Sequence, residues 1–161
     1  MVRRLAVLCI LTMFAAAAVH AEKHYGPGVT DTQILLGQTM PYSGPASAYA
    51  TYGKAQAAFF RMINEHGGVN GRKIELLSLD DGYSPPRTVD QIRKLVEQEQ
   101  VLAIFSSFGT PTNTAIVKYL NLNKVPHLFV TSGAAEFADS KTYPWTMGWR
   151  VNYVSEAKAY A

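Results

Sequence analysis

Residues 105–113 read Phe-Ser-Ser-Phe-Gly-Thr-Pro-Thr-Asn. An apolar run, residues 101–105, ends where this stretch begins, and Pro111 opens a segment with helical spacing. The pattern predicts a buried strand, a tight turn rich in hydroxyl groups, and the first turn of a helix. Such a junction presents backbone N–H groups and the positive end of the helix dipole to an anion. We therefore expect an anion-binding site here, with the other polar loops placed around it.

Strand-like and helix-like patterns alternate along the chain on both sides of this stretch. Apolar runs of strand length occupy residues 34–40, 73–79, 101–105 and 127–130. Amphipathic spacing predicts helices at 47–66, 86–99 and 111–121, then an extended segment at 145–151 and a last helix from Ser155. Buried apolar strands that alternate with amphipathic helices are typical of parallel sheets. The sequence therefore predicts an α/β fold with a doubly wound, mostly parallel sheet.

The spacing also predicts which helix faces are buried. The first helix is expected to bury Tyr52, Ala55, Phe59, Met62, Ile63 and His66. The second is expected to bury Val89, Ile92, Leu95 and Val96, and the third Ala115, Ile116, Tyr119 and Leu120.

Four loops follow the four predicted strands, at residues 42–49, 80–84, 106–110 and 131–136. Right-handed crossovers place all such loops at one edge of a parallel sheet, and this is the edge where ligands bind. The four loops are rich in hydroxyl groups, glycines and tyrosines, whereas the loops at the opposite edge are plainer. This asymmetry predicts a ligand-binding site at the carboxyl edge of the sheet.

The first 21 residues have the pattern of a secretory signal peptide. Arg3 and Arg4 are followed by an apolar run at 5–18 and by small residues around a cleavage site after Ala21. The run is too short to predict a stable membrane anchor. Residues 22–31 are expected to form a loose leader. The only cysteine, Cys9, lies within the signal, so no disulfide is expected in the secreted chain.

Charge and motif content exclude several function classes. The chain has 15 Lys+Arg and 12 Asp+Glu, and without Arg3 and Arg4 the net charge falls to about +1. There is no basic stripe with aromatic platforms, so no nucleic-acid partner is expected. The histidines outside the signal, His24, His66 and His127, are far apart and have no cysteine partners, so no metal or cofactor is expected.

The sequence carries no recognisable catalytic motif. It has no Gly-x-Ser-x-Gly elbow and no phosphate loop that ends in Gly-Lys-Ser/Thr. The pair Ser106-Ser107 has no acid–base partner that the sequence identifies. The protein is therefore not expected to be an enzyme, although an extracytoplasmic enzyme that uses one of these serines remains an alternative.

Two motifs resemble the branched-chain amino-acid binding protein family. They are Met40-Pro41-Tyr42-Ser43-Gly44-Pro45 after the first strand and Gly67-Gly68-Val69-Asn70-Gly71 after the first helix. Asp80-Asp81, the loop at 108–110 and the loop at 131–136 fall in the same order and spacing. The resemblance extends from Gly28 to Ala161. It implies a periplasmic substrate-binding protein of an ABC importer with the type I periplasmic fold, whose partners are a small ligand and a membrane permease.

The resemblance also implies where a ligand is held. Its carboxylate is expected at the start of the third helix, against Thr110 with Phe108 and Gly109 before it. Its ammonium is expected at Ala134, Ala135 and Glu136. Tyr49 matches an aromatic wall beside the ligand side chain. The segment Tyr143-Pro144-Trp145-Thr146-Met147-Gly148-Trp149 resembles a subgroup associated with small amino acids or aromatic carboxylates.

Each of these positions also has a plainer interpretation. Thr110 can act as a helix N-cap with Pro111 as the first helical residue, and this role can coexist with ligand binding. Glu136 can point to solvent, and Tyr49 can be a partly packed tyrosine. Tyr42, Ser43 and Tyr83 are weaker candidates that are expected mainly to shape turns.

The resemblance covers only the N-terminal part of the family's two-lobed proteins. Residues 32–150 are expected to form the N-terminal lobe, and residues 151–161 to begin the crossover to a second lobe that the sequence does not contain. The chain is accordingly expected to be a truncated form, with a weakened site. A ligand-sensing receptor domain of the same fold is the alternative function.

Overall fold

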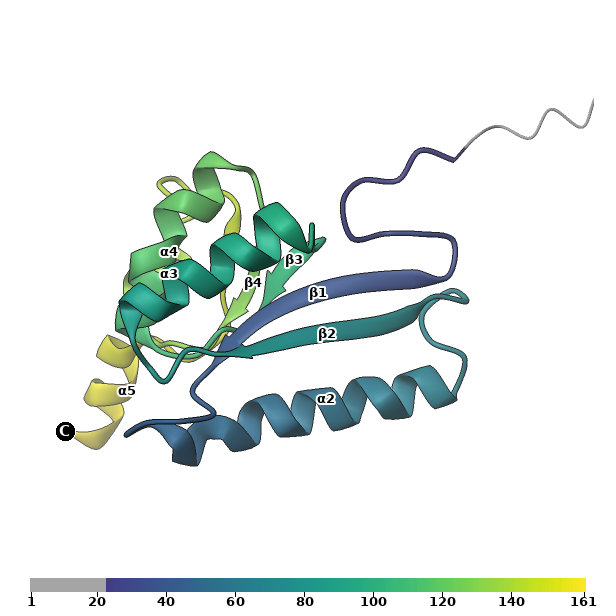
Figure 1. Ribbon diagram of the computed structural model, residues 1–161. Helices are drawn as coiled ribbons and strands as arrows, with labels where there is room; N and C mark the ends of the chain where they lie inside the picture. The colour runs from purple at the N-terminus through teal and green to yellow at the C-terminus, as the bar shows by residue number, and fades with distance from the viewer. Residues whose placement is uncertain (1–22) are drawn as a thin grey trace, which may run out of the picture.

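The computed structural model describes residues 23–161 (Figure 1). The predicted signal peptide, residues 1–21, lies outside the described residues. The leader packs on the edge of the fold through a small polar cluster, in which Arg72 donates to the Thr30 carbonyl at 2.7 Å and to the Tyr25 hydroxyl at 3.1 Å. In this cluster Asp31 accepts hydrogen bonds from Lys23 Nζ at 2.8 Å and from the Tyr25 hydroxyl at 2.6 Å.

The core of the fold is a five-stranded parallel sheet. Its strands are β1 (Gln33–Met40), β2 (Lys73–Asp80), β3 (Ala103–Phe105), β4 (His127–Val130) and β5 (Thr146–Gly148). They lie in the order β2-β1-β3-β4-β5, and every neighbouring pair is parallel. β1 and β2 pair without interruption from Gln33 opposite Lys73 to Met40 opposite Asp80. The predicted α/β fold with a doubly wound parallel sheet is therefore confirmed.

Helices cover both faces of this sheet. A 3-10 turn (Ser47–Tyr49) leads into α2 (Ala50–Glu65), which lies beneath β1 and β2, while α3 (Pro85–Arg93) and α4 (Thr110–Leu122) cover the other face (Figure 1). α3 continues into a π-turn (Lys94–Gln98), and a 3-10 turn (Ala135–Ala138) follows β4. The chain ends in α5 (Tyr153–Tyr160). Among the described residues, no helix has the length and apolar character that a membrane span needs.

The main apolar core lies between the sheet and the pair α3–α4. It contains Ile92, Leu95, Val101, Ile104, Ile116 and Leu120. The predicted inner face of the second helix is confirmed. In the third helix the prediction for Ala115 is wrong, because Ala115 is exposed and Val117 is fully buried instead. The first turn of α4 sets this rotation, since Thr112 and Asn113 point inward and hydrogen-bond to the carbonyls of Phe108 and Ser107.

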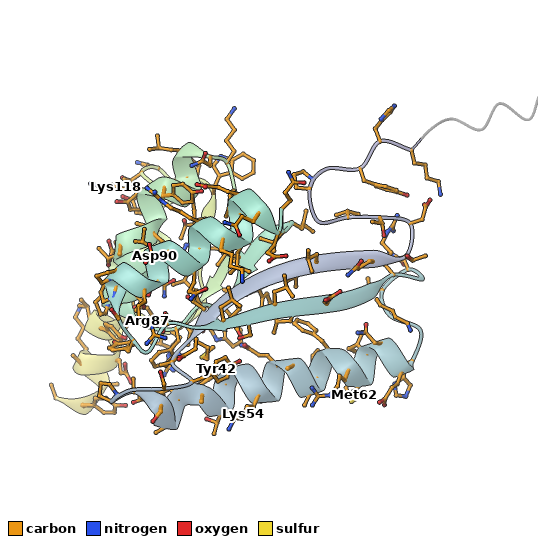
Figure 2. The ribbon with its side chains drawn as sticks, in the orientation of Figure 1. Tyr42, Lys54, Met62, Arg87, Asp90 and Lys118 are labelled. Carbon is orange, nitrogen blue, oxygen red and sulfur yellow. The ribbon has the colours of Figure 1, made fainter. Side chains whose placement is uncertain are left out.

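The predicted inner face of α2 is wrong by about one residue position around the helix. Phe59 and Met62 are 54% and 45% exposed, and Tyr52 and Ala55 are exposed as well. The residues that face the strands are Ala50, Gly53, Gln56, Ala57 and Phe60. Gly53 decides this orientation, because a Cβ there would collide with the Tyr42 hydroxyl. Figure 2 shows Tyr42 between α2 and the strands, and Lys54 pointing away from them.

An aromatic groove runs beside α2 along the strands that this helix leaves uncovered. It has a volume of about 480 Å³ and is lined mainly by Tyr52, Phe59, Phe60, Phe105, Phe129 and Trp149. Phe129 touches Phe105 on one side and Trp149 on the other, with ring centroids 5.6 and 6.2 Å apart. Trp145 and Trp149 flank β5, and both are exposed.

Candidate ligand-binding site

A pocket of about 590 Å³ lies at the carboxyl edge of the sheet. All four loops that follow strands β1 to β4 contribute to it, as does the segment that leads into α5. The lining residues are Pro45, Ala46, Tyr49, Tyr52, Tyr83, Phe108, Gly109, Thr110, Thr131, Arg150, Tyr153 and Glu156. The structure therefore brings Tyr49, Phe108, Gly109 and Thr110 together, and adds Tyr83 from the weaker candidates.

Aromatic rings form one wall of the pocket. Tyr49 stacks on Phe108 with ring centroids 4.5 Å apart and an interplanar angle of 27°. Tyr52 and Tyr83 each lie 5.9 Å from the same Phe108 ring. Rings in such offset arrangements attract one another and leave flat faces and polar hydroxyls at the surface. This wall suits a flat or branched apolar group that carries a polar end.

Thr110 lies at the start of α4, with its hydroxyl turned toward the fourth loop. Its Oγ1 is 2.7 Å from Ser132 Oγ. The N-cap position is taken by Gly109, at φ 102° and ψ 155°, and Thr110 is the first helical residue. The alternative that made Thr110 the cap is therefore wrong by one position. Because α4 has 13 residues, its N-terminus brings a positive partial charge to the Thr110 side of the pocket.

The backbone N–H groups of Phe108 and Gly109 are already used. They donate to the carbonyls of Thr39 and Thr131, at 3.3 and 3.2 Å, and extend the pairing of β3 with its neighbours. Phe108 therefore offers its ring rather than an N–H donor. Gly109 offers the absence of a side chain, since a Cβ there would collide with the ring of Tyr83.

The residues of the fourth loop do not lie where the family resemblance predicts them. Ala134, Ala135 and Glu136 do not line the pocket. Glu136 Oε1 instead accepts a hydrogen bond of 2.5 Å from Thr114 on α4. The 3-10 turn that begins at Ala135 is anchored by Phe137, which is buried against Val117 and Val130, and this anchor turns the loop outward.

Tyr42 and Ser43 also lie outside the pocket lining. The Tyr42 hydroxyl pairs with Ser78 Oγ at 2.6 Å, and Ser43 Oγ donates to Asp80 Oδ2 at 2.6 Å. Burial raises the pKa of Asp80, but hydrogen bonds from Ser43, Gly82 and Arg87 outweigh it and lower the pKa to about 2. Asp80 therefore stays ionised at neutral pH and holds the first two loops together.

Sequence reasoning missed the contribution of the segment 150–156. Arg150 lines the pocket, and its Nη1 donates to the Tyr52 hydroxyl at 3.3 Å. The ring of Tyr153 lies against Gly133, and the backbone N–H of Tyr153 donates to the Gly133 carbonyl at 2.8 Å. The backbone N–H of Gly133, with the hydroxyls of Thr110 and Ser132, lowers the pKa of the Tyr153 phenol. These three donors form an environment that favours a negatively charged oxygen.

The histidines do not contribute to this site. His66 is exposed at the end of α2, with Nδ1 2.7 Å from the Met62 carbonyl oxygen. His127 is fully buried in β4, with Nε2 3.0 Å from Asn113 Oδ1. Within residues 23–161, no three His, Cys, Asp or Glu side chains converge as a metal site requires.

The contact at Gly133 predicts an effect of its own. In Gly133→Ala the new Cβ would lie 2.5 Å from both Tyr153 Cδ1 and the Val151 carbonyl oxygen, and Gly133 is not in the left-handed region. We expect the segment 149–160 to move away, because a backbone atom cannot yield as a side chain can. Hydrogen exchange should become faster in 149–160 and stay unchanged in α4. Unchanged exchange in 149–160 would contradict this packing.

Comparison with known proteins identifies the family of the chain. Residues 33–161 match the profile of a protein family described as periplasmic binding protein. The chain belongs to this family. A Leu/Ile/Val-binding protein homolog 7 from Brucella abortus is 29% identical over 133 residues, which is 80% of this chain. An amino acid binding protein from Pseudomonas aeruginosa is 32% identical over 78 residues, or 47% of this chain.

A solved structure shows the same architecture. It is the structure of a possible leucine/isoleucine/valine-binding protein from Rhodopirellula baltica, and it superposes on 80% of this chain with a TM-score of 0.72 and 25% identity. The chain spans 34% of that protein, 31% of the Brucella relative and 20% of the Pseudomonas relative. It therefore corresponds to about a third or less of the length of these family members.

Proposed function

We propose that the protein binds a small solute with a carboxylate group, an amino acid or a related acid, as the extracytoplasmic component of an ABC importer. The observation that carries the proposal is Thr110. Its hydroxyl lies at the N-terminus of α4, beside Ser132 and at the edge of an aromatic wall. A helix N-terminus with hydroxyl donors stabilises a carboxylate, and the rings contact the rest of the ligand.

The names of the relatives support the same ligand class. The Brucella relative is named for leucine, isoleucine and valine, and the Pseudomonas relative for amino acids. Family membership supports a location in the periplasm and a membrane permease as partner. These are properties of longer proteins, so for this chain they form part of the proposal.

The surroundings of Ser106 and Ser107 do not support the alternative of an enzyme that uses one of these serines. Ser106 Oγ accepts from Gln56 Nε2 and lies 2.8 Å from Thr131 Oγ1, while Ser107 Oγ accepts from the Thr39 N–H. Both hydroxyls are buried, and among the described residues neither hydrogen-bonds to a histidine or a carboxylate. Activation of a serine nucleophile needs such a base.

Calorimetric titration with L-leucine, L-isoleucine, L-valine and benzoate tests the proposal. We expect at least one of these acids to bind, and Thr110→Ala to weaken it roughly 10- to 100-fold, since a hydrogen bond to a charged group contributes about 1.5–3 kcal/mol. Thr110→Ser, which keeps the hydroxyl, should retain most of the affinity.

Thr114→Ala is the matched control for Thr110→Ala. Thr114 lies on the same helix, but its hydroxyl bonds to Glu136 outside the pocket lining. Equal losses in Thr110→Ala and Thr114→Ala would argue against the proposed carboxylate position. If none of the four acids gives binding heat with the wild-type protein, this result would argue against a small carboxylate as the ligand.

A further inference from the structure

A network of buried and part-buried hydrogen bonds connects α2 to β1 and β2 and to the residues that directly follow β3 and β4. Gln56 Nε2 donates to Ser106 Oγ at 2.7 Å, and Ser106 Oγ lies 2.8 Å from Thr131 Oγ1. On its other side, Gln56 Oε1 accepts from Gln38 Nε2 at 2.5 Å. Gln38 Oε1 in turn accepts from Ser78 Oγ at 2.8 Å. Gln56 is the one residue of this hydrogen-bond network that lies on α2.

Because most of these polar groups are buried, their hydrogen bonds restrict how the side chains can be oriented. Gln38 is fully buried, and Ser106 and Thr131 are almost so. A buried amide or hydroxyl without a partner costs free energy, so each of these groups holds its partners in place. The contact residues near Gln56, such as Gly53 and Ala57, are small, so their side chains add few directional contacts of their own. The amide of Gln56 adds directional contacts to Gln38 and Ser106 at this point of the helix.

The two ends of this connection belong to different elements that line the pocket. Tyr49 precedes α2 directly and Tyr52 lies in its first turn, so both move with the helix. Thr131 lines the pocket itself, and Ser106 stands two residues before Phe108 on the strand side. Gln56 does not line the pocket. We propose that Gln56 is a positioning residue, which holds Tyr49 and Tyr52, at the start of α2, at a fixed distance from the hydroxyl-bearing edge of β3 and β4.

Asn64 gives a matched control on the same helix. It lies eight residues after Gln56 and also fixes α2 to the sheet, since its side chain accepts from the Ile74 N–H at 2.8 Å and donates to the Ile74 carbonyl at 2.7 Å. That contact is at the opposite end of α2 from Tyr49. Both side chains therefore attach α2 to the sheet, but only Gln56 attaches it beside the pocket.

The test compares Gln56→Met with Asn64→Leu in the whole chain. For Gln56→Met we expect faster hydrogen exchange in residues 47–56 and an affinity loss of about tenfold for whichever of L-leucine, L-isoleucine, L-valine or benzoate the wild type binds. For Asn64→Leu we expect a lower melting temperature with unchanged exchange in 47–56 and unchanged affinity.

Two results would overturn the inference. One is unchanged exchange in residues 47–56 of Gln56→Met. The other is an affinity loss in Asn64→Leu that equals the loss in Gln56→Met at a similar drop in melting temperature, since this would show general destabilisation. The affinity measurement rests on the proposed function, whereas the hydrogen-exchange measurement does not. A wild type that binds none of the four acids would refute that function, and the exchange comparison would still decide the role of Gln56.

Discussion

Gly109→Ala is expected to lower the free energy of unfolding by about 3 kcal/mol and to abolish ligand binding at millimolar concentrations. Gly109 adopts φ 102° and ψ 155°, a region that is essentially restricted to glycine and costs other residues about 1–3 kcal/mol. The new Cβ would also collide with the ring of Tyr83 and approach Thr112 Oγ1 to 2.8 Å. Urea unfolding and calorimetric titration would measure the two effects.

Alanine variants of two other glycines separate the cost of backbone strain from the cost of a steric collision. Gly67 has φ +96° but no atom within 4 Å of a Cβ built on it, so Gly67→Ala isolates the strain and should cost about 1–2 kcal/mol. Gly26 has neither feature, and Gly26→Ala should change stability by less than about 0.5 kcal/mol. Gly109→Ala should exceed both and be the only one to affect binding. A cost for Gly109→Ala equal to that for Gly26→Ala would contradict the geometry of this turn.

His127 is expected to make the protein lose stability steeply in acid. Its complete burial lowers its pKa to about 3, against about 6.5 in an unfolded chain. Between these two values the unfolded state binds a proton that the native state does not. Stability therefore falls as pH decreases from 6.5 to 3, at up to about 1.4 kcal/mol per pH unit and up to about 5 kcal/mol in total. Above pH 6.5 this residue contributes no pH dependence.

The measurement is the free energy of unfolding as a function of pH for the wild type and for His127→Gln. Glutamine keeps a side-chain N–H that can donate to Asn113 Oδ1, but it does not titrate. The difference between the two curves removes the contribution of Asp80 and of other carboxyl groups. We expect the difference to change with pH only below about 6.5. Parallel curves across that range would mean that His127 is not held neutral.

The order and type of the main elements could be predicted from the sequence, because they depend on local patterns. The strand at His127–Val130 was predicted to the residue, and the second helix presents the predicted face to the core. Parallel pairing followed from the alternation of strands and helices. The carboxyl-edge site followed in turn, since the topology alone brings Tyr49, Tyr83 and Thr110 to one place.

The face of α2 could not be predicted from periodicity, because the periodic signal counts apolar side chains and this helix buries a glycine and an amide. Gly53 lets the helix approach Tyr42, and Gln56 satisfies its polar groups within the sheet. Phe59 and Met62 then lie on the flank. A prediction that places large apolar residues inside the protein therefore buries Phe59 and Met62, which are exposed. The same prediction leaves Gly53 and Gln56 outside, although these two residues face the sheet.

The pocket was incompletely predicted for a different reason. Arg150 and Tyr153 come from a segment beyond the fourth loop, and its return to the pocket depends on a tertiary contact, the packing of Tyr153 on Gly133. No local pattern encodes that contact. The same applies to Glu136, whose direction is set by the burial of Phe137 one position later.

The position of the two tryptophans determines what fluorescence can report. The chain has only Trp145 and Trp149, which flank β5 and are 40% and 65% exposed. Native emission should already be red-shifted, so unfolding followed by tryptophan intensity will have a small amplitude and will report mainly on the last strand. Trp149 also adjoins Arg150 of the pocket. Iodide quenching of the tryptophan emission, to which both residues contribute, is therefore an optical signal that ligand titrations can follow without a label.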